Sequence, residues 1–126
     1  MTKKKTEKLS VTHSREISWL KWYFLRDKTN PKKTVLEQKI HDSFLNKKTD
    51  EAAFYVNLKI VTSEVISNTD DKLLQTIKEV YVYENINVIG ACQTILFLSP
   101  TPAYIHLNRW FDNYFYQTYK YLSLTK

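Results

Sequence analysis

Apolar side chains recur at helical spacing along most of this chain. Ile17, Leu20 and Phe24 fall on one face of a helix predicted over residues 15–26, and Ser14 is a suitable N-cap for it. Because the same spacing returns in several later segments, we expect a protein built mainly from helices.

Polar and acidic residues indicate where further helices begin. Asn30 followed by Pro31 predicts a helix that continues to about residue 47, since the first helical position does not need an N–H. Further helices are predicted from Thr49 and Thr69, each of which is followed by two acidic residues. Carboxylates in a first turn suit the positive end of the helix dipole.

The pattern changes in the last third of the chain. Alternating and β-prone residues predict a small β-hairpin within residues 80–98. The spacing of Val88, Cys92 and Ile95 also permits a helix there. A long aromatic-rich helix is predicted over residues 102–123.

Length and composition agree with a small, largely helical domain. The chain has 126 residues, 43% of them hydrophobic, and a single glycine. We expect a flexible basic arm at residues 1–13 and a single globular domain at 14–126, because a chain of this length can bury a core without metal or disulfide. Cys92 is the only cysteine and no apolar N-terminal segment is present, which predicts a cytoplasmic protein.

Charge is distributed unevenly along the chain. Residues 1–48 hold 13 Lys and Arg against 5 Asp and Glu, whereas residues 49–126 hold 6 against 8. A basic N-terminal third on a nearly neutral remainder predicts an anionic partner, of which nucleic acid is the commonest for an intracellular protein.

Residues 63–80 resemble the helix-turn-helix of many bacterial and phage regulators. Ser67 and Asn68 depart from that pattern, because they stand where glycine and an apolar residue are usual. The positions that match the pattern are Ser63, Val65, Ile66, Thr69, Leu73, Ile77 and Val80.

The resemblance extends to winged-helix DNA-binding proteins over residues 53–123. A helix-turn-helix-like segment (57–80), a wing-like segment (80–98) and the helix at 102–123 follow one another in the same order. The resemblance implies a mainly α fold with a small β-hairpin (α+β), double-stranded DNA as the partner, and a small regulator or a plasmid or phage accessory factor as the function.

In that interpretation the helix at 69–80 enters the major groove and a basic surface contacts phosphates. Asp70 and Asp71 count against close approach to phosphates and are better explained as caps. The residues expected to bind nucleic acid are Lys3, Lys4, Lys5, Lys8, Arg15, Lys21, Lys32, Lys33, Lys39, Thr69, Lys72, Gln75, Thr76 and Lys78.

The last helix is apolar on nearly every side, which predicts burial on more than one side and a second subunit as one covering surface. We therefore expect a homodimer. The residues expected at the dimer interface are Tyr104, Trp110, Phe111, Tyr114, Phe115 and Tyr119.

Catalytic chemistry is not indicated. His13, His41 and His106 are isolated and lack metal-ligand spacing, and the chain contains no phosphate-binding glycine loop. We expect no enzyme activity, no metal, no cofactor, no small-molecule substrate and no membrane partner.

One alternative fold and function remains open. If residues 80–98 are helical, five or six helices form an all-α bundle. Such a bundle suits a small protein-protein interaction module of the inhibitor or immunity type, with the aromatic last helix as its binding face.

Overall fold

The computed structural model describes residues 9–124, with side chains as far as Tyr121. Within that range the fold is all-α and contains no β-strand. A helical turn at residues 9–12 precedes the named elements. These elements are α2 (Ser14–Phe24), α3 (Val35–Leu45), α4 (Thr49–Ser67), α5 (Asp71–Ile77), η1 (Lys78–Val82), α6 (Val88–Ala91), η2 (Cys92–Leu96) and α7 (Pro100–Leu124).

The hairpin predicted at 80–98 is wrong, and so is the α+β fold class with its wing. Two π-helical turns, η1 and η2, extend α5 and α6 across most of this segment. Their wider turns bury the neighbouring Tyr81 and Val82 together, whereas a strand would place them on opposite faces. The all-α alternative therefore describes the fold.

Helix starts were predicted with mixed success. The start of α4 at Thr49 is confirmed. The start predicted at Pro31 is wrong, because Thr34 caps α3 instead through a capping box with Glu37. Thr34 Oγ1 accepts from the Glu37 backbone N–H at 3.1 Å, and Glu37 Oε1 accepts from the Thr34 N–H at 2.8 Å.

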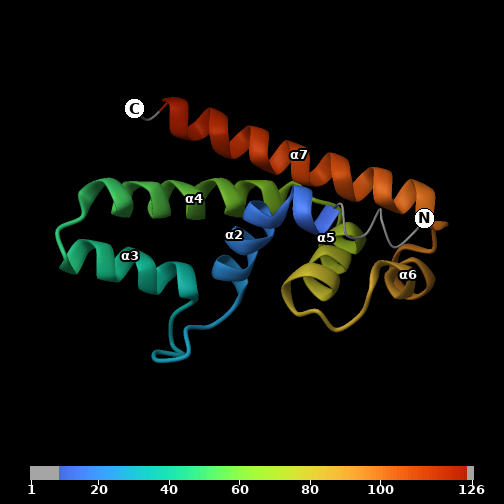
Figure 1. Cartoon of the computed structure of the whole chain (residues 1–126), viewed down its shortest axis with the longest axis horizontal. Helices are drawn as coiled ribbons and strands as arrows, with labels where there is room; N and C mark the ends of the chain where they lie inside the picture. Colours follow the sequence, from blue (N-terminus) through green and yellow to red (C-terminus); the bar gives the residue numbers. More distant parts are fainter. Residues whose placement is uncertain (1–8, 125–126) are drawn as a thin grey trace.

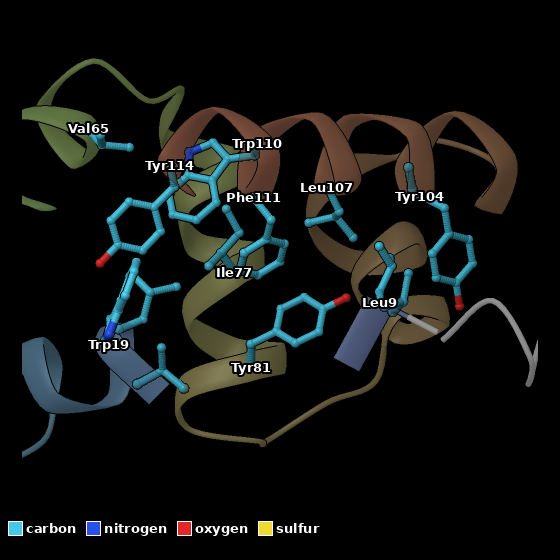
Figure 2. Close-up of a cluster of buried hydrophobic side chains, with 14 of the residues drawn as sticks. Leu9, Trp19, Val65, Ile77, Tyr81, Tyr104, Leu107, Trp110, Phe111 and Tyr114 are labelled. Carbon is cyan, nitrogen blue, oxygen red and sulfur yellow. The ribbon is translucent and has the colours of Figure 1, made fainter. Parts of the chain in front are cut away.

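Helix α7 forms one edge of the molecule and lies along α4 (Figure 1). Helix α2 and the α5–η1 rod pass beneath it, and α3 packs against α4. The core runs along the inner side of α7, where Leu107, Phe111 and Tyr114 are fully buried. Figure 2 shows the Phe111 ring beside Ile77 and Tyr81, and the Tyr114 ring pointing toward Trp19.

Two tyrosine hydroxyls in this core differ in their hydrogen bonding. Tyr114 Oη lies 2.6 Å from Thr62 Oγ1, and both groups are buried. Tyr81 Oη is buried without a hydrogen-bond partner among the described residues. Burial raises the pKa of both hydroxyls well above the usual range, so both stay protonated at neutral pH.

No single helix within residues 9–124 is both long enough and apolar enough to cross a membrane. Val88–Leu96 and Pro100–Tyr121 reach that length and composition only as a pair bent by 98°. Many apolar residues of this pair, including Val88, Cys92 and Leu107, are buried in the core of the chain.

Candidate nucleic-acid interface

A second pair of helices with a sharp turn between them lies near the C-terminal end, apart from α4 and α5, which span the helix-turn-helix segment predicted at 57–80. The rod formed by α6 and η2 ends at Leu96, α7 begins at Pro100, and the two axes differ by 98°. Two helices at about 90–120°, joined by a turn of three or four residues, define this motif.

The backbone at residues 97–99 explains the sharp turn. Phe97 has φ 54° and ψ 43°, so it is in the left-handed region that often ends a helix. Ser99 O then accepts from the Ala103 N–H at 3.3 Å in the first turn of α7. Pro100 and Pro102 lie where a missing N–H leaves no hydrogen bond unmade.

The two helices are fixed by their buried sides. Asn87 Oδ1 caps α6 by accepting from the Gly90 N–H at 2.8 Å. From the first helix Val88 and Ala91 are buried, and from α7 Ala103 and Leu107 are buried. These contacts with the core leave the opposite side of α7 uncovered.

The uncovered side of the first half of α7 carries mixed polar and apolar groups. Thr101, Ile105, His106 and Arg109 are exposed there, with Ile105 at 45% exposure. Ile105 and Arg109 lie on the side of the helix opposite Leu107, and Thr101 and His106 flank them. A hydroxyl, an imidazole, a guanidinium and an alkyl group are therefore presented together to solvent.

The first turn of α5 lies beside this motif. Lys72 Nζ lies 5.5 Å from the centroid of the Phe97 ring, and Phe97 itself is 70% exposed. Lys72 and Gln75 are both exposed. One of the residues predicted to bind nucleic acid, Lys72, thus lies beside the turn, on a neighbouring helix.

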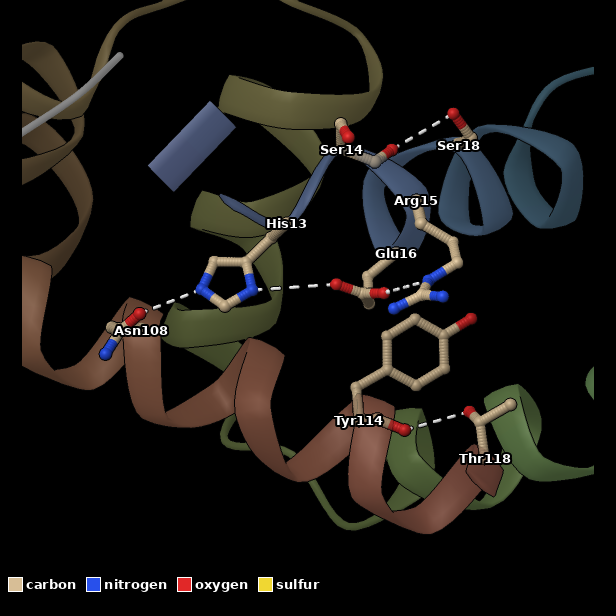
Figure 3. Close-up of polar contacts among 8 residues, drawn as sticks. All are labelled: His13, Ser14, Arg15, Glu16, Ser18, Asn108, Tyr114 and Thr118. Atoms are coloured by element: carbon tan, nitrogen blue, oxygen red, sulfur yellow. Dashed lines mark hydrogen bonds and ion pairs between the residues drawn. The ribbon is translucent and has the colours of Figure 1, made fainter. Parts of the chain in front are cut away.

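A buried polar network holds α2 against α7 (Figure 3). The His13 ring is buried and stacks on Phe111 with 5.0 Å between centroids. His13 Nε2 donates to Asn108 Oδ1 at 2.8 Å, and His13 Nδ1 lies 3.6 Å from Glu16 Oε1. Arg15 Nε donates to Glu16 Oε2 at 3.1 Å. This network joins the N-terminal end of the described chain to the exposed half of α7.

The helix at 69–80 presents only part of the face that was predicted. Thr76 is fully buried and donates to the Lys72 carbonyl at 2.9 Å, so its outward placement was wrong. Thr69 does not cap α5, because Asp70 does so, and Thr69 Oγ1 instead accepts from Trp110 Nε1 at 2.9 Å. The Lys78 ammonium lies over the Phe24 ring, with 5.0 Å between Nζ and the centroid.

Three further predicted basic residues contact groups of the protein itself. The Arg15 guanidinium lies over the Phe115 ring at 4.7 Å, Lys39 Nζ lies over the Trp22 ring at 4.6 Å, and Lys21 Nζ is 3.7 Å from Glu84 Oε2. The Glu84 carboxylate offsets the charge of Lys21, whereas the ring contacts restrict where Arg15 and Lys39 place their charged groups.

The other predicted basic residues are not gathered at the motif. Lys32 and Lys33 lie in the connection between α2 and α3, at the edge of the molecule farthest from α7 (Figure 1). Lys3, Lys4, Lys5 and Lys8 lie outside the described residues. Of the arm predicted at 1–13, residues 9–12 are helical and Leu9 and His13 are buried.

The residues predicted for a dimer interface divide into two groups. Tyr104, Trp110, Phe111 and Tyr114 are buried in the core of the chain itself, which accounts for the apolar pattern without a second subunit. Phe115 and Tyr119 are exposed, with their ring centroids 6.3 Å apart.

Other potential sites offer little specific chemistry. Within residues 9–124 no group of three His, Cys, Asp or Glu side chains is placed to hold a metal ion. Burial raises the pKa of the Cys92 thiol, which disfavours the reactive thiolate. A cavity of about 490 Å³ between α4 and α7 has Glu64, Asp70 and Lys120 in its lining, and these mixed charges favour no single class of ligand.

No protein-family model, curated protein or solved structure matches this chain. The sequence signals for the motif at 88–109 were nevertheless present. The helical spacing of Val88, Cys92 and Ile95, followed by Ser99-Pro100, predicts one helix that stops and another that begins.

Proposed function

We propose that this protein binds double-stranded DNA through the helix-turn-helix at residues 88–109, with the first half of α7 as the recognition helix. The observation that carries this proposal is the 98° angle between the two helices across a three-residue turn, with the outer side of α7 uncovered. In DNA-binding helix-turn-helix proteins the second helix lies in the major groove.

The exposed groups on α7 suit a major groove. Arg109 can donate two hydrogen bonds to a guanine edge or contact a phosphate, and Ile105 can pack against a thymine methyl group. Thr101, near the helix start, can contact a phosphate together with free backbone N–H groups. Lys72 stands beside the turn and adds a phosphate contact from α5.

The charge of the chain supports the same partner. A formal net charge of +6 favours association with a polyanion and speeds encounter with it. Because two helices meet at 98° across a short turn and the net charge is positive, we place the protein among small DNA-binding regulators.

Substitution of one arginine tests this proposal. Arg109→Ala should weaken binding to duplex DNA about tenfold or more, because a base or phosphate contact is worth on the order of 1–3 kcal/mol. Arg26→Ala is the matched control, since Arg26 is exposed in the connection between α2 and α3. Fluorescence anisotropy with a random duplex across a salt series measures both.

Equal affinities for the two variants would exclude α7 as the reading helix. Absence of duplex binding by the wild-type protein at low salt would reject the DNA-binding proposal altogether. A single-stranded oligonucleotide and duplex RNA in the same assay distinguish double-stranded DNA from other nucleic acids.

A second candidate function rests on the other half of α7. Phe115, Tyr116 and Tyr119 are exposed together there, and aromatic rings are common at the centres of protein interfaces. A protein-binding module is therefore the alternative. Tyr116→Glu with Tyr119→Glu should abolish self-association or partner capture and leave DNA affinity unchanged, as measured by sedimentation and anisotropy.

A further inference from the structure

The cavity of about 490 Å³ lies where α4 ends and α5 begins, and the second half of α7 lines its other side. Val61, Val65 and Leu73 supply apolar side chains to the lining, and Trp110 adds an indole ring. Val61, Val65 and Trp110 are buried, so they form the floor of the cavity. An apolar floor of this kind suits a hydrocarbon or aromatic group of a small molecule.

The Trp110 indole joins the two sides of the cavity. Its Nε1 donates to Thr69 Oγ1 at 2.9 Å, which connects α7 to the segment between α4 and α5. Because this N–H is already paired, the indole offers a ligand mainly its ring carbons. Polar groups that select a ligand must therefore come from the rim.

Charged side chains of opposite sign line the cavity from two different helices. Glu64 on α4 and Lys120 on α7 are both exposed, and neither forms a salt bridge among the described residues. Asp70 also lines the cavity, but its Oδ2 accepts from the Lys72 and Leu73 N–H groups at the start of α5. One unpaired charge of each sign thus remains available to a ligand.

The signs of these charges alone select no ligand, whereas their separation above a shared apolar floor does. A ligand with a single charge meets either Glu64 or Lys120 as a group of like sign. A ligand with both charges can pair with both side chains while its uncharged part lies against Trp110. Charge-assisted hydrogen bonds of this kind are stronger than those between neutral groups.

We propose that this cavity binds a small zwitterion with an apolar side group. Glu64 pairs with its ammonium group, Lys120 pairs with its carboxylate, and the Trp110 ring packs against its apolar group. Free amino acids and dipeptides share this chemistry and differ in the distance between their two charges. The site is independent of the proposed DNA contact, so it is tested without DNA.

Isothermal titration calorimetry with L-phenylalanine and with alanyl-phenylalanine measures the affinity for both sources of the zwitterion. At least one of them should bind at a single site per chain. Three comparison compounds each lack one feature: phenethylamine has no carboxylate, hydrocinnamate has no ammonium group, and alanine has no large apolar group. Each should bind about tenfold or more weakly than the better zwitterion, because it loses either a charge-assisted hydrogen bond or the burial of a phenyl ring.

Substitutions that remove charge assign the two ends of the ligand. Glu64→Gln should weaken binding of the zwitterion about fivefold or more and narrow its advantage over hydrocinnamate. Lys120→Gln should weaken it similarly and narrow its advantage over phenethylamine. Both side chains are exposed, so both variants should fold. Glu51→Gln and Lys28→Gln are the matched controls and should keep the wild-type affinity, since both residues are exposed and lie outside the cavity lining.

Failure of both zwitterions to bind at millimolar concentration would overturn the proposal. Phenethylamine or hydrocinnamate binding as tightly as the zwitterion would overturn it too, because binding would then not require both charges. Equal losses in Glu64→Gln and Glu51→Gln would place the ligand elsewhere on the protein. Binding of phenylalanine alone, or of the dipeptide alone, would support the site and identify the source of the ligand.

Discussion

Two tyrosine hydroxyls in the core, those of Tyr114 and Tyr81, differ in whether the described residues supply a hydrogen-bond partner. Tyr114 Oη meets Thr62 Oγ1 at 2.6 Å, whereas Tyr81 Oη is buried without a partner among the described residues. A buried polar group stabilises a fold only when it is hydrogen-bonded, so removal of the two hydroxyls should have opposite consequences.

We expect Tyr114→Phe to lower the free energy of unfolding by about 1–2 kcal/mol, because it leaves the Thr62 hydroxyl buried and unpaired. Tyr81→Phe is the matched control and should be neutral or slightly stabilising. Urea denaturation measures both variants. A larger loss for Tyr81→Phe than for Tyr114→Phe would contradict this assignment of the hydrogen bonds.

Among single residues, Glu37 should make the clearest contribution to the pH dependence of stability. The Thr34 backbone N–H, and then the Lys59 ammonium at 3.2 Å, lower the pKa of the Glu37 carboxyl below its ordinary value of 4.5. Because the folded pKa is the lower one, the stabilisation is present above pH 4.5 and is lost as pH falls through the lowered value.

Glu37→Gln should therefore be less stable than wild type at pH 7, and the difference should shrink steadily below pH 4.5. Lys59→Gln removes only the ion pair and keeps the capping box, so its effect at pH 7 should be the smaller of the two. Thermal unfolding at a series of pH values tests this. A difference between Glu37→Gln and wild type that grows toward acid would contradict the sign.

Among the elements, the turn between η2 and α7 decides whether the helix-turn-helix exists. Phe97 adopts a left-handed conformation although it is not glycine, which costs about 1 kcal/mol. Its ring is 70% exposed, so few packing contacts offset that cost. The conformation is held by the two helices that it joins.

Phe97→Val should destabilise the protein by about 1–2 kcal/mol and weaken DNA binding, because a β-branched residue tolerates this conformation poorly. Phe97→Gly adopts it without strain and should retain the stability to within about 1 kcal/mol. Chemical denaturation and anisotropy measure the pair. Equal stability of the two variants would show that the left-handed turn is not maintained in solution.

The sequence predicted elements better than it predicted their local geometry. Thr49 and its acidic neighbours located the start of α4, and the aromatic repeat located α7. The hairpin at 80–98 failed because a π-turn shifts side chains out of the 3.6-residue period, so Val80 to Tyr83 resemble a strand. Asn30-Pro31 failed as a helix start because Thr34 and Glu37 form a complete capping box.

At the scale of the whole molecule, the sequence predicted a helix-turn-helix at 57–80, where residues 68–70 join α4 and α5, but it did not predict the bend between α6–η2 and α7. The angle between α6–η2 and α7 depends on contacts that the buried residues Val88, Ala91 and Leu107 make in the core. The spacing of residues along the chain does not predict that angle. The same non-local packing buries Tyr104, Trp110 and Phe111 in the core of the chain. A helical pattern alone cannot distinguish such core residues from residues of a dimer interface.

The most direct test of the central claim is a map of the amides that respond to DNA. In ¹⁵N-labelled protein titrated with a random duplex, we predict the largest chemical-shift changes at residues 97–109, with smaller changes at Lys72 and Gln75. Residues 35–45 of α3 serve as the internal reference and should not respond. Changes centred on α3, or on Tyr116 and Tyr119 alone, would contradict the assignment of α7 as the recognition helix.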